Sequence, residues 1–285
     1  MAGVARPRRS QGGKRNRVNE REIHEMRSRS LADNLGGEFV GRRILVTGGA
    51  SGVGEACVGY FLGLGATVAC IDVKVPARDD AKFVHLSADL RDRDAVSSAV
   101  AEIAERFHGL DTLVNNAGVS FVGTVEDGTE DDWNRLWDIN VMGAVRSTRA
   151  ALPLLRRSDS AAIVNVSSLT ATSGIRQRAA YTATKGAIES MTRAMAADLV
   201  SEGITVNAVN PGTVDTPFMA ELAARAEDPV QRRADFESRQ PIGRMVTPVE
   251  VAHAVAYFAH PLSRSTTGST LMVDGGIFNL HMTRA

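Results

Sequence analysis

Three polar residues of this chain have the types and spacing that proton transfer at an alcohol or carbonyl oxygen requires: Ser168, Tyr181 and Lys185. A helix that starts near Ala180 would place Tyr181 and Lys185 four residues apart on one face. Ser168 follows the apolar run 161–166, which predicts a buried strand. The three side chains would then meet at the carboxyl end of a strand, where open α/β sheets hold their ligands.

These residue types suit general acid–base chemistry. A free phenol has a pKa of about 10, and a nearby ammonium lowers it by favouring the phenolate. Tyr181 would then exchange a proton with the substrate oxygen near neutral pH while Ser168 holds that oxygen by a hydrogen bond. The alternative for an isolated Tyr-x-x-x-Lys is an amphipathic helix with a packed tyrosine and a surface lysine. The surrounding elements must therefore decide between the two interpretations.

The charge of the chain is balanced overall and uneven at its start. The 285 residues include 33 basic and 33 acidic ones, so no whole-protein field indicates nucleic acid or membrane. Residues 1–30 hold nine arginines and lysines against three glutamates. We predict that residues 1–38 form a basic extension that is disordered or loosely docked. A nucleic-acid or membrane contact of this tail, and a translation start at Met26, remain alternatives.

The remaining composition predicts a reducing, cytoplasmic enzyme without a metal. Cys57 and Cys70 fall in an apolar helix and an apolar strand, so we interpret them as small core residues. The six histidines are scattered and show no metal-ligand spacing. No apolar run approaches the roughly 18 residues of a membrane span.

A glycine turn after the first predicted strand indicates a dinucleotide site. Strand 43–47 precedes Gly48, Gly52 and Gly54; a helix follows, and a second strand ends at Asp72. Glycines allow the backbone to approach a pyrophosphate at a helix N-terminus, and the acidic residue can accept hydrogen bonds from a ribose. Because a carboxylate at 72 would repel a 2′-phosphate, we predict NAD over NADP. Lys74 and Arg78 lie close to Asp72 in sequence, and their positive charges favour NADP instead.

The alternation of strands and helices continues to the end of the chain. Asp92 is expected to cap a helix, and a helix from about Glu130 is expected to carry Asn140 at its middle. A turn is expected at 210–217, followed by a mobile helical lid at about 217–240. Seven strands alternating with helices predict one α/β domain over residues 39–285, a doubly wound Rossmann fold with a parallel sheet. The expected strands are 43–47, 66–72, 82–86, 110–114, 161–166, 203–209 and 269–273.

From about Gly41 to Asn279 the chain resembles the short-chain dehydrogenase/reductase superfamily. The matching motifs are the glycine turn, Asn115-Asn116-Ala117-Gly118, Asn140, Ser168, Tyr181 with Lys185, and Pro211-Gly212. The resemblance implies hydride transfer at a nicotinamide, usually in a homotetramer. It implies a catalytic tetrad of Asn140, Ser168, Tyr181 and Lys185, with Asn140 supporting a water relay. The implied cofactor-binding residues are Thr47, Gly48, Ser51, Gly52, Val53, Gly54, Asp72, Asp89, Leu90, Asn116, Ala117, Gly118, Tyr181, Lys185, Pro211, Gly212, Val214 and Thr216.

Residues 178–244 are similar to one branch of that superfamily. The branch contains cytosolic 3-hydroxybutyrate dehydrogenase type 2 and dehydrogenases of sugars and keto-deoxy sugar acids. The resemblance implies that Arg178 and Arg239 grip a substrate carboxylate beside Ser168 and Tyr181. At a further arginine position of the animal enzyme this chain has Leu222, for which Arg176 or Arg225 are candidate replacements. The alternative is that these arginines form surface or subunit-interface salt bridges.

We therefore predict an NAD-dependent oxidoreductase that interconverts a secondary alcohol and a ketone. Its substrate is expected to be a small hydroxy acid or a sugar-derived acid. One alternative is a dehydrogenase of a neutral sugar, a polyol or a secondary-metabolite ketone. An alternative of another class is a non-catalytic NAD-binding sensor or scaffold, against which the complete set of Ser168, Tyr181 and Lys185 argues.

Overall fold

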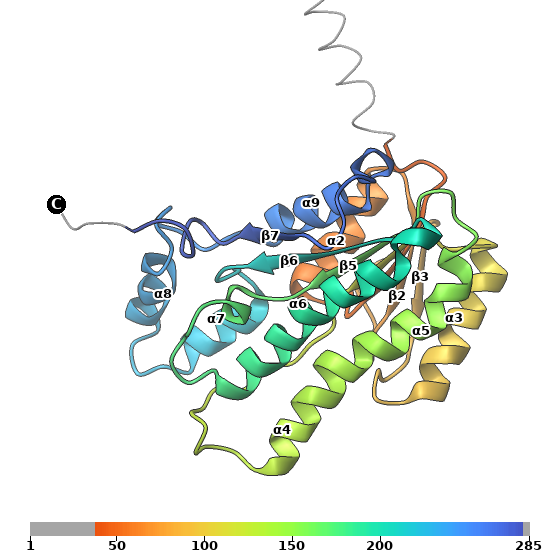
Figure 1. Cartoon of the computed structure of the whole chain (residues 1–285). Helices are drawn as coiled ribbons and strands as arrows, with labels where there is room; N and C mark the ends of the chain where they lie inside the picture. Colours follow the sequence, from red (N-terminus) through yellow and green to blue (C-terminus); the bar gives the residue numbers. More distant parts are fainter. Residues whose placement is uncertain (1–37, 282–285) are drawn as a thin grey trace, which may run out of the picture. The chain divides into compact units, whose positions relative to one another are not determined.

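Seven parallel strands form one sheet in the order β3-β2-β1-β4-β5-β6-β7 (Figure 1). The computed structural model describes residues 38–281, so the predictions for the basic extension lie outside the described residues, save for Glu38. The order runs outward from β1 in one direction and from β4 in the other, which places the topological switch point between these two strands. The strands are β1 Arg43–Thr47, β2 Thr67–Ile71, β3 Phe83–Leu86, β4 Thr112–Asn115, β5 Ala162–Val166, β6 Thr205–Pro211 and β7 Thr270–Val273.

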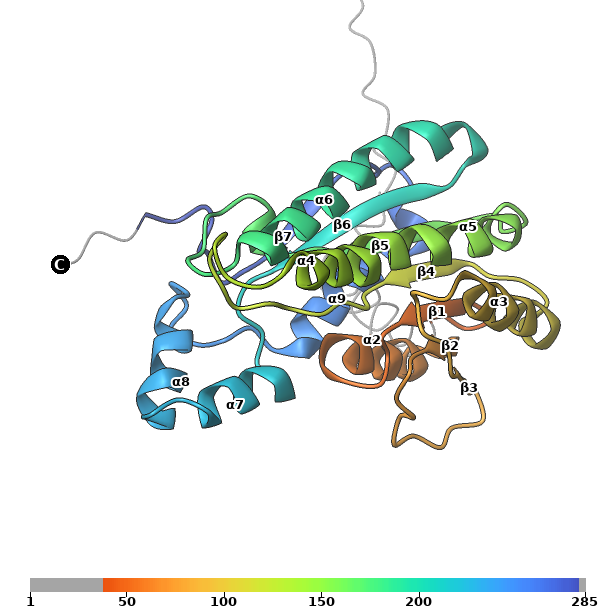
Figure 2. The ribbon, with the colours of Figure 1, turned by 90° about the horizontal axis from the view of Figure 1, so that it is seen from below.

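Helices cover both faces of the sheet (Figure 2). One face packs against α2 and α9, and the other packs against α3, α5 and α6. The helices are α2 Gly52–Gly63, α3 Arg93–Phe107, α4 Glu130–Trp137, α5 Gly143–Leu155, α6 Ala179–Leu199, α7 Pro217–Ala224, α8 Pro229–Ser238 and α9 Pro248–Ala259. Four short segments join them: η1 Asp138–Met142, η2 Leu169–Ala171, η3 Val200–Glu202 and η4 Pro261–Ser263.

The strands are apolar throughout because both faces of the sheet are buried. In β1, Ile44 and Val46 pack into the core under α2 and α9, while Leu45 packs into the core under α3 and α5. This alternation is the two-residue repeat of a strand, and a continuous apolar run is typical of a parallel sheet covered on both sides. The predicted seven-stranded, doubly wound parallel sheet is confirmed.

Several helix starts follow directly from local sequence. Asp92 caps α3 by accepting hydrogen bonds from the amides of Asp94 and Ala95, as predicted. Thr129 and Thr247 form capping boxes at the starts of α4 and α9. The segment predicted to act as a lid forms α7 and α8, and each helix begins with a proline at a position where no amide donor is needed.

Two predictions at the carboxyl edge of the sheet need correction. Asn140 does not lie in the middle of an α-helix, because α4 ends at Trp137 and Asn140 belongs to the π-helical turn η1. There the amide of Gly143 donates to the carbonyl of Asp138, which widens the helix by one residue. Asn210 and Pro211, expected in a turn, are the last residues of β6, where Pro211 pairs with Val273 of β7.

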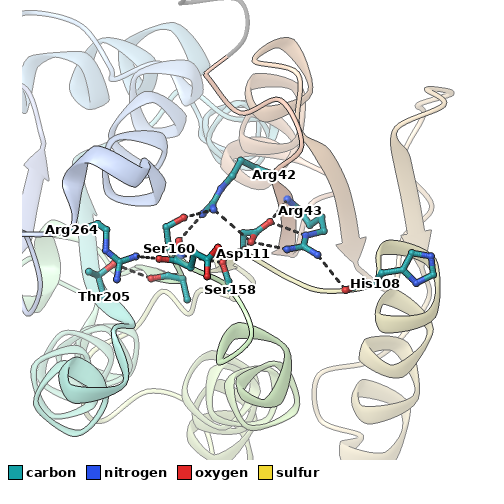
Figure 3. A network of polar contacts seen from close by, with 10 residues as sticks. Arg42, Arg43, His108, Asp111, Ser158, Ser160, Thr205 and Arg264 are labelled. Carbon is teal, nitrogen blue, oxygen red and sulfur yellow. Dashed lines mark hydrogen bonds and ion pairs between the residues drawn. The ribbon is translucent and has the colours of Figure 1, made fainter.

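A network of arginines and one carboxylate ties strands together at the amino edge of the sheet (Figure 3). Asp111, just before β4, accepts three hydrogen bonds of 2.9 Å from Arg43 and one of 2.6 Å from Ser158. Arg42 lies 3.6 Å from the same carboxylate and also donates to Ser160. Arg264 donates to two backbone carbonyls nearby. The network lies at the opposite edge from the predicted active site, so its role is structural.

No helix in residues 38–281 is long and apolar enough to cross a lipid bilayer.

Candidate active site

Ser168, Tyr181 and Lys185 come together at the carboxyl end of β5. Tyr181 and Lys185 lie on successive turns of α6, and Ser168 lies two residues beyond the end of β5. The Lys185 ammonium is 5.7 Å from the centre of the Tyr181 ring and donates a 2.8 Å hydrogen bond to the Val166 carbonyl. Lys185 is 5% exposed and Ser168 is 8% exposed. A hydroxyl, a phenol and a buried amine are thus adjacent, as the spacing predicted.

The electrostatics of this group differ in one respect from the expectation. Burial raises the pKa of Tyr181, and the Ser168 hydroxyl and the Arg178 guanidinium act in the opposite direction. Lys185, whose ammonium is directed to the Val166 carbonyl, is not among the groups that lower this pKa. Burial lowers the pKa of Lys185 to about 8.

Asn140 is held rigidly beside Lys185 by the π-helical turn. Its side-chain oxygen accepts a 2.8 Å hydrogen bond from the Val119 amide, and its nitrogen donates to the Val119 carbonyl at 2.9 Å and to Thr184 at 3.0 Å. A Cβ atom on Gly118 would lie 3.2 Å from the Asn140 oxygen and 3.6 Å from the Lys185 nitrogen. Gly118 therefore leaves open the space that Asn140 and Lys185 face together.

A cavity of about 500 Å³ opens at the same edge of the sheet, over the switch point. Eleven of the predicted cofactor residues line it: Gly48, Ser51, Gly52, Val53, Asp72, Asp89, Leu90, Asn116, Ala117, Gly118 and Thr216. Seven others are not among its lining residues: Thr47, Gly54, Tyr181, Lys185, Pro211, Gly212 and Val214. Val73, Lys74, Arg91, Arg135 and Phe218 also line the cavity and were not among the cofactor residues expected from the sequence.

Thr47, Gly54 and Asn116 shape the glycine turn. The Thr47 hydroxyl accepts hydrogen bonds from the amides of Asn116 and Ala117, at 3.1 and 3.2 Å. The Asn116 amide group donates to the carbonyls of Thr47 and Gly48. A Cβ atom on Gly54 would lie 2.0 Å from the Gly48 oxygen, so only glycine permits this packing. The turn fits a dinucleotide because its backbone is open to close approach.

Asp72 is fixed at the end of β2 with its carboxylate in the cavity. It accepts hydrogen bonds from the amides of Ala50, at 3.0 Å, and Lys74, at 2.9 Å. The nearby arginines are directed elsewhere, because Arg78 lines a separate cavity against α2 and Arg91 forms a 2.7 Å ion pair with Asp89. Lys74 and Arg135 are the cations without a carboxylate partner among the described residues that line the cavity with Asp72.

Below the glycine turn lies a buried thiol. A Cβ atom on Gly49 would lie 2.7 Å from the Cys70 sulfur, so the turn rests on that side chain. Cys57 and Cys70 are both free and buried, as predicted for small core residues. Burial raises the pKa of each thiol to about 12.

The predicted substrate arginines come from two elements, the start of α6 and the end of α8. Arg178 immediately precedes α6 and donates to the Phe121 carbonyl at 3.2 Å. Arg239 follows α8 and stacks on the Phe236 ring at 4.9 Å. Arg232, which the sequence did not single out, stacks on the same ring at 4.8 Å. Neither Arg178 nor Arg239 forms an ion pair among residues 38–281, which goes against an internal salt-bridge role.

The two candidate replacement arginines differ from this group. Arg225 lies 3.8 Å from Glu221 on the exposed side of α7, and Arg176 is exposed. The charges that act on Arg178 come instead from Tyr181, Arg239 and Arg232. Arg232 follows Leu222 by ten residues and lies on α8, whose start is marked in the sequence by Asp228 and Pro229.

Comparison with known proteins identifies the family. A family model described as enoyl-(acyl carrier protein) reductase matches residues 48–278, which include the glycine turn, Asn140, Ser168, Tyr181 and Lys185. The chain belongs to the short-chain dehydrogenase/reductase family. It is an oxidoreductase that acts on the CH–OH group of a secondary alcohol or on the corresponding ketone, as predicted.

Curated relatives in this family act on varied alcohols. The chain is 36% identical over 250 residues to an L-fucose dehydrogenase of Bos taurus, covering 85% of this chain and 91% of the relative. It is 35% identical to a cis-4-hydroxycyclohexanecarboxylate dehydrogenase of Sinomonas cyclohexanicum, covering 85% and 98%. It is 34% identical to a 3-alpha-(or 20-beta)-hydroxysteroid dehydrogenase of Mycobacterium tuberculosis, covering 85% and 91%.

Solved structures of the family have the same architecture. The ligand-free aldohexose dehydrogenase of Thermoplasma acidophilum superposes with a TM-score of 0.82 at 30% identity, covering 87% of this chain and 98% of that one. The structure of ElxO with NADP bound superposes with a TM-score of 0.77 at 26% identity, covering 84% and 99%. Together they support a nicotinamide cofactor and leave the choice between NAD and NADP to the residues of this chain.

Proposed function

We propose that this chain is an NAD-dependent dehydrogenase of a small hydroxy acid or a sugar-derived acid. The observation that carries the proposal is that Tyr181, Lys185 and Ser168 meet at the carboxyl end of β5, with Lys185 facing Gly118, a residue that lines the same cavity as Asp72. Arg178, whose charge acts on Tyr181, and Arg239 form no ion pair among residues 38–281, which supports an acidic substrate. The relative that acts on cis-4-hydroxycyclohexanecarboxylate is consistent with this class, whereas the dehydrogenases of L-fucose and aldohexose are consistent with the alternative of a neutral sugar.

Each residue of the site has a distinct role in this proposal. The nicotinamide accepts or supplies the hydride when it is bound. The Tyr181 oxygen takes the alcohol proton during oxidation and returns it during reduction, while the Ser168 hydroxyl orients the same substrate oxygen. Lys185 holds a positive charge next to the phenol and faces the space at Gly118. Asn140 fixes Val119 and Thr184 around that space.

The cofactor is predicted to lie along the cavity with its pyrophosphate at the amino end of α2. Ser51, Gly52 and Val53 present backbone amides there, where the helix dipole favours an anion. Asp89 and Leu90 lie beside the predicted adenine. Pro211, Gly212 and Val214 follow β6, and we assign them to the nicotinamide end together with Thr216.

A single substitution tests the mechanism. Tyr181→Phe removes the proton-transferring hydroxyl and keeps the ring, so turnover should fall by at least about 1,000-fold, whereas NADH binding measured by fluorescence should be retained. The matched control is Tyr257→Phe, which changes an exposed tyrosine of α9. Turnover that persists in the Tyr181→Phe protein contradicts the mechanism. A screen of NAD reduction over hydroxy acids, sugars and polyols identifies the substrate class.

The preference for NAD rests on Asp72. Its carboxylate is oriented by two backbone amides and would repel a 2′-phosphate. Asp72→Ser should raise kcat/KM with NADP and lower it with NAD, because Lys74 then remains without the opposing carboxylate. Arg78→Ser serves as a control, since Arg78 lines the separate cavity. A wild-type preference for NADP would contradict the assignment.

Two other functions are distinguished by the same measurements. A dehydrogenase of neutral sugars, polyols or secondary-metabolite ketones would reduce NAD with uncharged substrates and tolerate loss of Arg178 and Arg239. A non-catalytic NAD-binding sensor would bind NADH and show no turnover with any substrate.

The homotetramer and the cytoplasmic location stay predictions, which sedimentation and cell fractionation test. The basic extension 1–38 and a lid at 217–240 are likewise part of the proposal, and deletion of the extension tests its role in activity, assembly and nucleic-acid retention.

A further inference from the structure

Three arginines near the active site act on one another and have no carboxylate partner among residues 38–281: the charge of Arg178 acts on Tyr181, and the charges of Arg232 and Arg239 act on Arg178. Arg178 comes from the start of α6, while Arg232 and Arg239 come from the lid helix α8 and its end. Both lid guanidinium groups stack on one ring, that of Phe236, at 4.8 and 4.9 Å from its centre. Phe236 is only 1% exposed, so the ring is a rigid support that holds both cations in place.

The charges of the three residues act on one another. Burial lowers the pKa of Arg178, and the positive charges of Arg239 and Arg232 lower it further, against the effect of Tyr181. Burial and Arg232 likewise lower the pKa of Arg239. The acidic group that acts on Arg239 is Asp235, whose carboxylate accepts a 2.9 Å hydrogen bond from the Gln231 side chain.

Other arginines of the lid region are paired. Arg225 lies 3.8 Å from Glu221, and Arg233 lies 2.8 Å from Asp215 and 3.0 Å from Glu237. None of Arg178, Arg232 and Arg239 has a carboxylate within 4.0 Å among residues 38–281. Like charges held close together are unfavourable unless an anion joins them. Within one short segment, Arg225 and Arg233 are therefore neutralised by carboxylates, whereas Arg232 and Arg239 are held on Phe236 without one.

We propose that Arg232 completes a three-arginine site that selects a substrate carrying two negative charges near its reacting hydroxyl. This inference rests on the proposed function. Guanidinium groups bind carboxylate and phosphate oxygens in a forked, bidentate manner. A monocarboxylate engages two of the three cations and leaves the third uncompensated, whereas a dianion engages all of them. The substrate class is therefore a hydroxy dicarboxylate or a hydroxy compound with a phosphate monoester.

Anion binding to the NADH-loaded enzyme tests the proposal without a known substrate. Malonate, inorganic phosphate at pH 8 and acetate are titrated at one fixed ionic strength, because salt screens exposed charges. Protein melting temperature and NADH fluorescence report binding. At least one of the two dianions is expected to bind about tenfold more tightly than acetate, a difference of about 1.4 kcal/mol. Tighter malonate indicates a dicarboxylate substrate, and tighter phosphate indicates a phosphate monoester.

Variants of the lid show whether Arg232 is responsible. Arg232→Gln should lower the affinity for the preferred dianion about tenfold and leave acetate binding nearly unchanged. Arg232→Lys should give an intermediate loss, since it keeps the charge without the fork. Arg225→Gln, on the same lid and paired with Glu221, should bind as the wild type does. Equal affinity for acetate and both dianions, or dianion binding that Arg232→Gln leaves unchanged, overturns the inference.

The result is separable from that of the proposed function. If the enzyme reduces NAD with a hydroxy monoacid and shows no dianion preference, the dehydrogenase function is supported and the three-arginine site is contradicted. If dianions bind tightly and no alcohol is oxidised, the three-arginine site is supported and the proposed function is contradicted.

Discussion

Replacement of Lys185 by methionine should make the protein more stable at neutral pH while abolishing its activity. The Lys185 ammonium is buried, and its single hydrogen-bond partner in the described chain is the Val166 carbonyl. Burial lowers its pKa from 10.5 to about 8, which corresponds to a destabilisation of about 3 kcal/mol at pH 7. Methionine has a similar length and carries no charge. Loss of the bond to Val166 costs about 1 kcal/mol, so the net gain is about 2 kcal/mol.

The direction of the Lys185 pKa shift determines how the stability difference between the two proteins changes with pH. The folded pKa lies below that of the unfolded chain, so the penalty is complete below about pH 8 and vanishes as the pH rises through 10.5. At pH 9.5 the remaining penalty is about 1.4 kcal/mol. Lys185→Met should therefore exceed the wild type in free energy of unfolding at pH 7 and nearly equal it at pH 9.5.

Urea unfolding of the cofactor-free protein, at one protein concentration, measures the difference at both pH values. Lys74→Met, which removes an exposed ammonium, is the control and should change stability by less than about 0.5 kcal/mol at either pH. A Lys185→Met protein that is less stable than the wild type at pH 7, or a difference that does not shrink at pH 9.5, refutes the reasoning.

Three further substitutions probe other parts of the chain. Asp111→Asn leaves Arg42 and Arg43 without their carboxylate and should lower the free energy of unfolding by about 2–4 kcal/mol. Because the Asp111 pKa is lowered in the folded protein, the difference from wild type should shrink as the pH falls below about 4. A loss under about 1 kcal/mol in urea at pH 7 would contradict this. Gly54→Ala places a Cβ atom 2.0 Å from the Gly48 oxygen. In a fluorescence titration this variant should bind NADH at least about tenfold more weakly, a loss of about 1.4 kcal/mol. The control Gly63→Ala, whose Cβ atom meets nothing within 4 Å, should bind NADH as the wild type does. Glu189→Leu removes the acceptor of the 2.8 Å bond from Asn210, and an unsatisfied buried amide costs about 1–3 kcal/mol; a melting temperature equal to that of the wild type would count against it.

The sheet and its order of motifs could be predicted from sequence because each signal is local. Apolar runs of four to seven residues gave every strand to within about two residues. Asp92 was expected at a helix start, and it accepts two amide hydrogen bonds there. The glycine turn and Asp72 lie within one strand-helix-strand unit, so their proximity also follows from sequence alone.

The features that sequence did not predict depend on contacts between distant residues. The π-helical turn around Asn140 has the same apolar periodicity as an α-helix over so few residues, so no pattern marks it. Arg43 and Asp111 are 68 positions apart, and nothing local joins them. The pKa of Tyr181 depends on burial and on Ser168, which lies 13 positions earlier, rather than on the neighbouring lysine. Arg232 and Phe236 lie on one helix, but the effect of the Arg232 charge on Arg178 joins residues 54 positions apart.

The buried Cys70 thiol under the glycine turn can also report how often the cofactor site opens. With a pKa of about 12, the Cys70 sulfur is almost entirely protonated and shielded at neutral pH, so a disulfide reagent can reach it only when the turn lifts away. The modification rate, followed by mass spectrometry, then reports the frequency of that opening. Protection by NADH converts the same rate into a measure of how strongly the cofactor closes the turn.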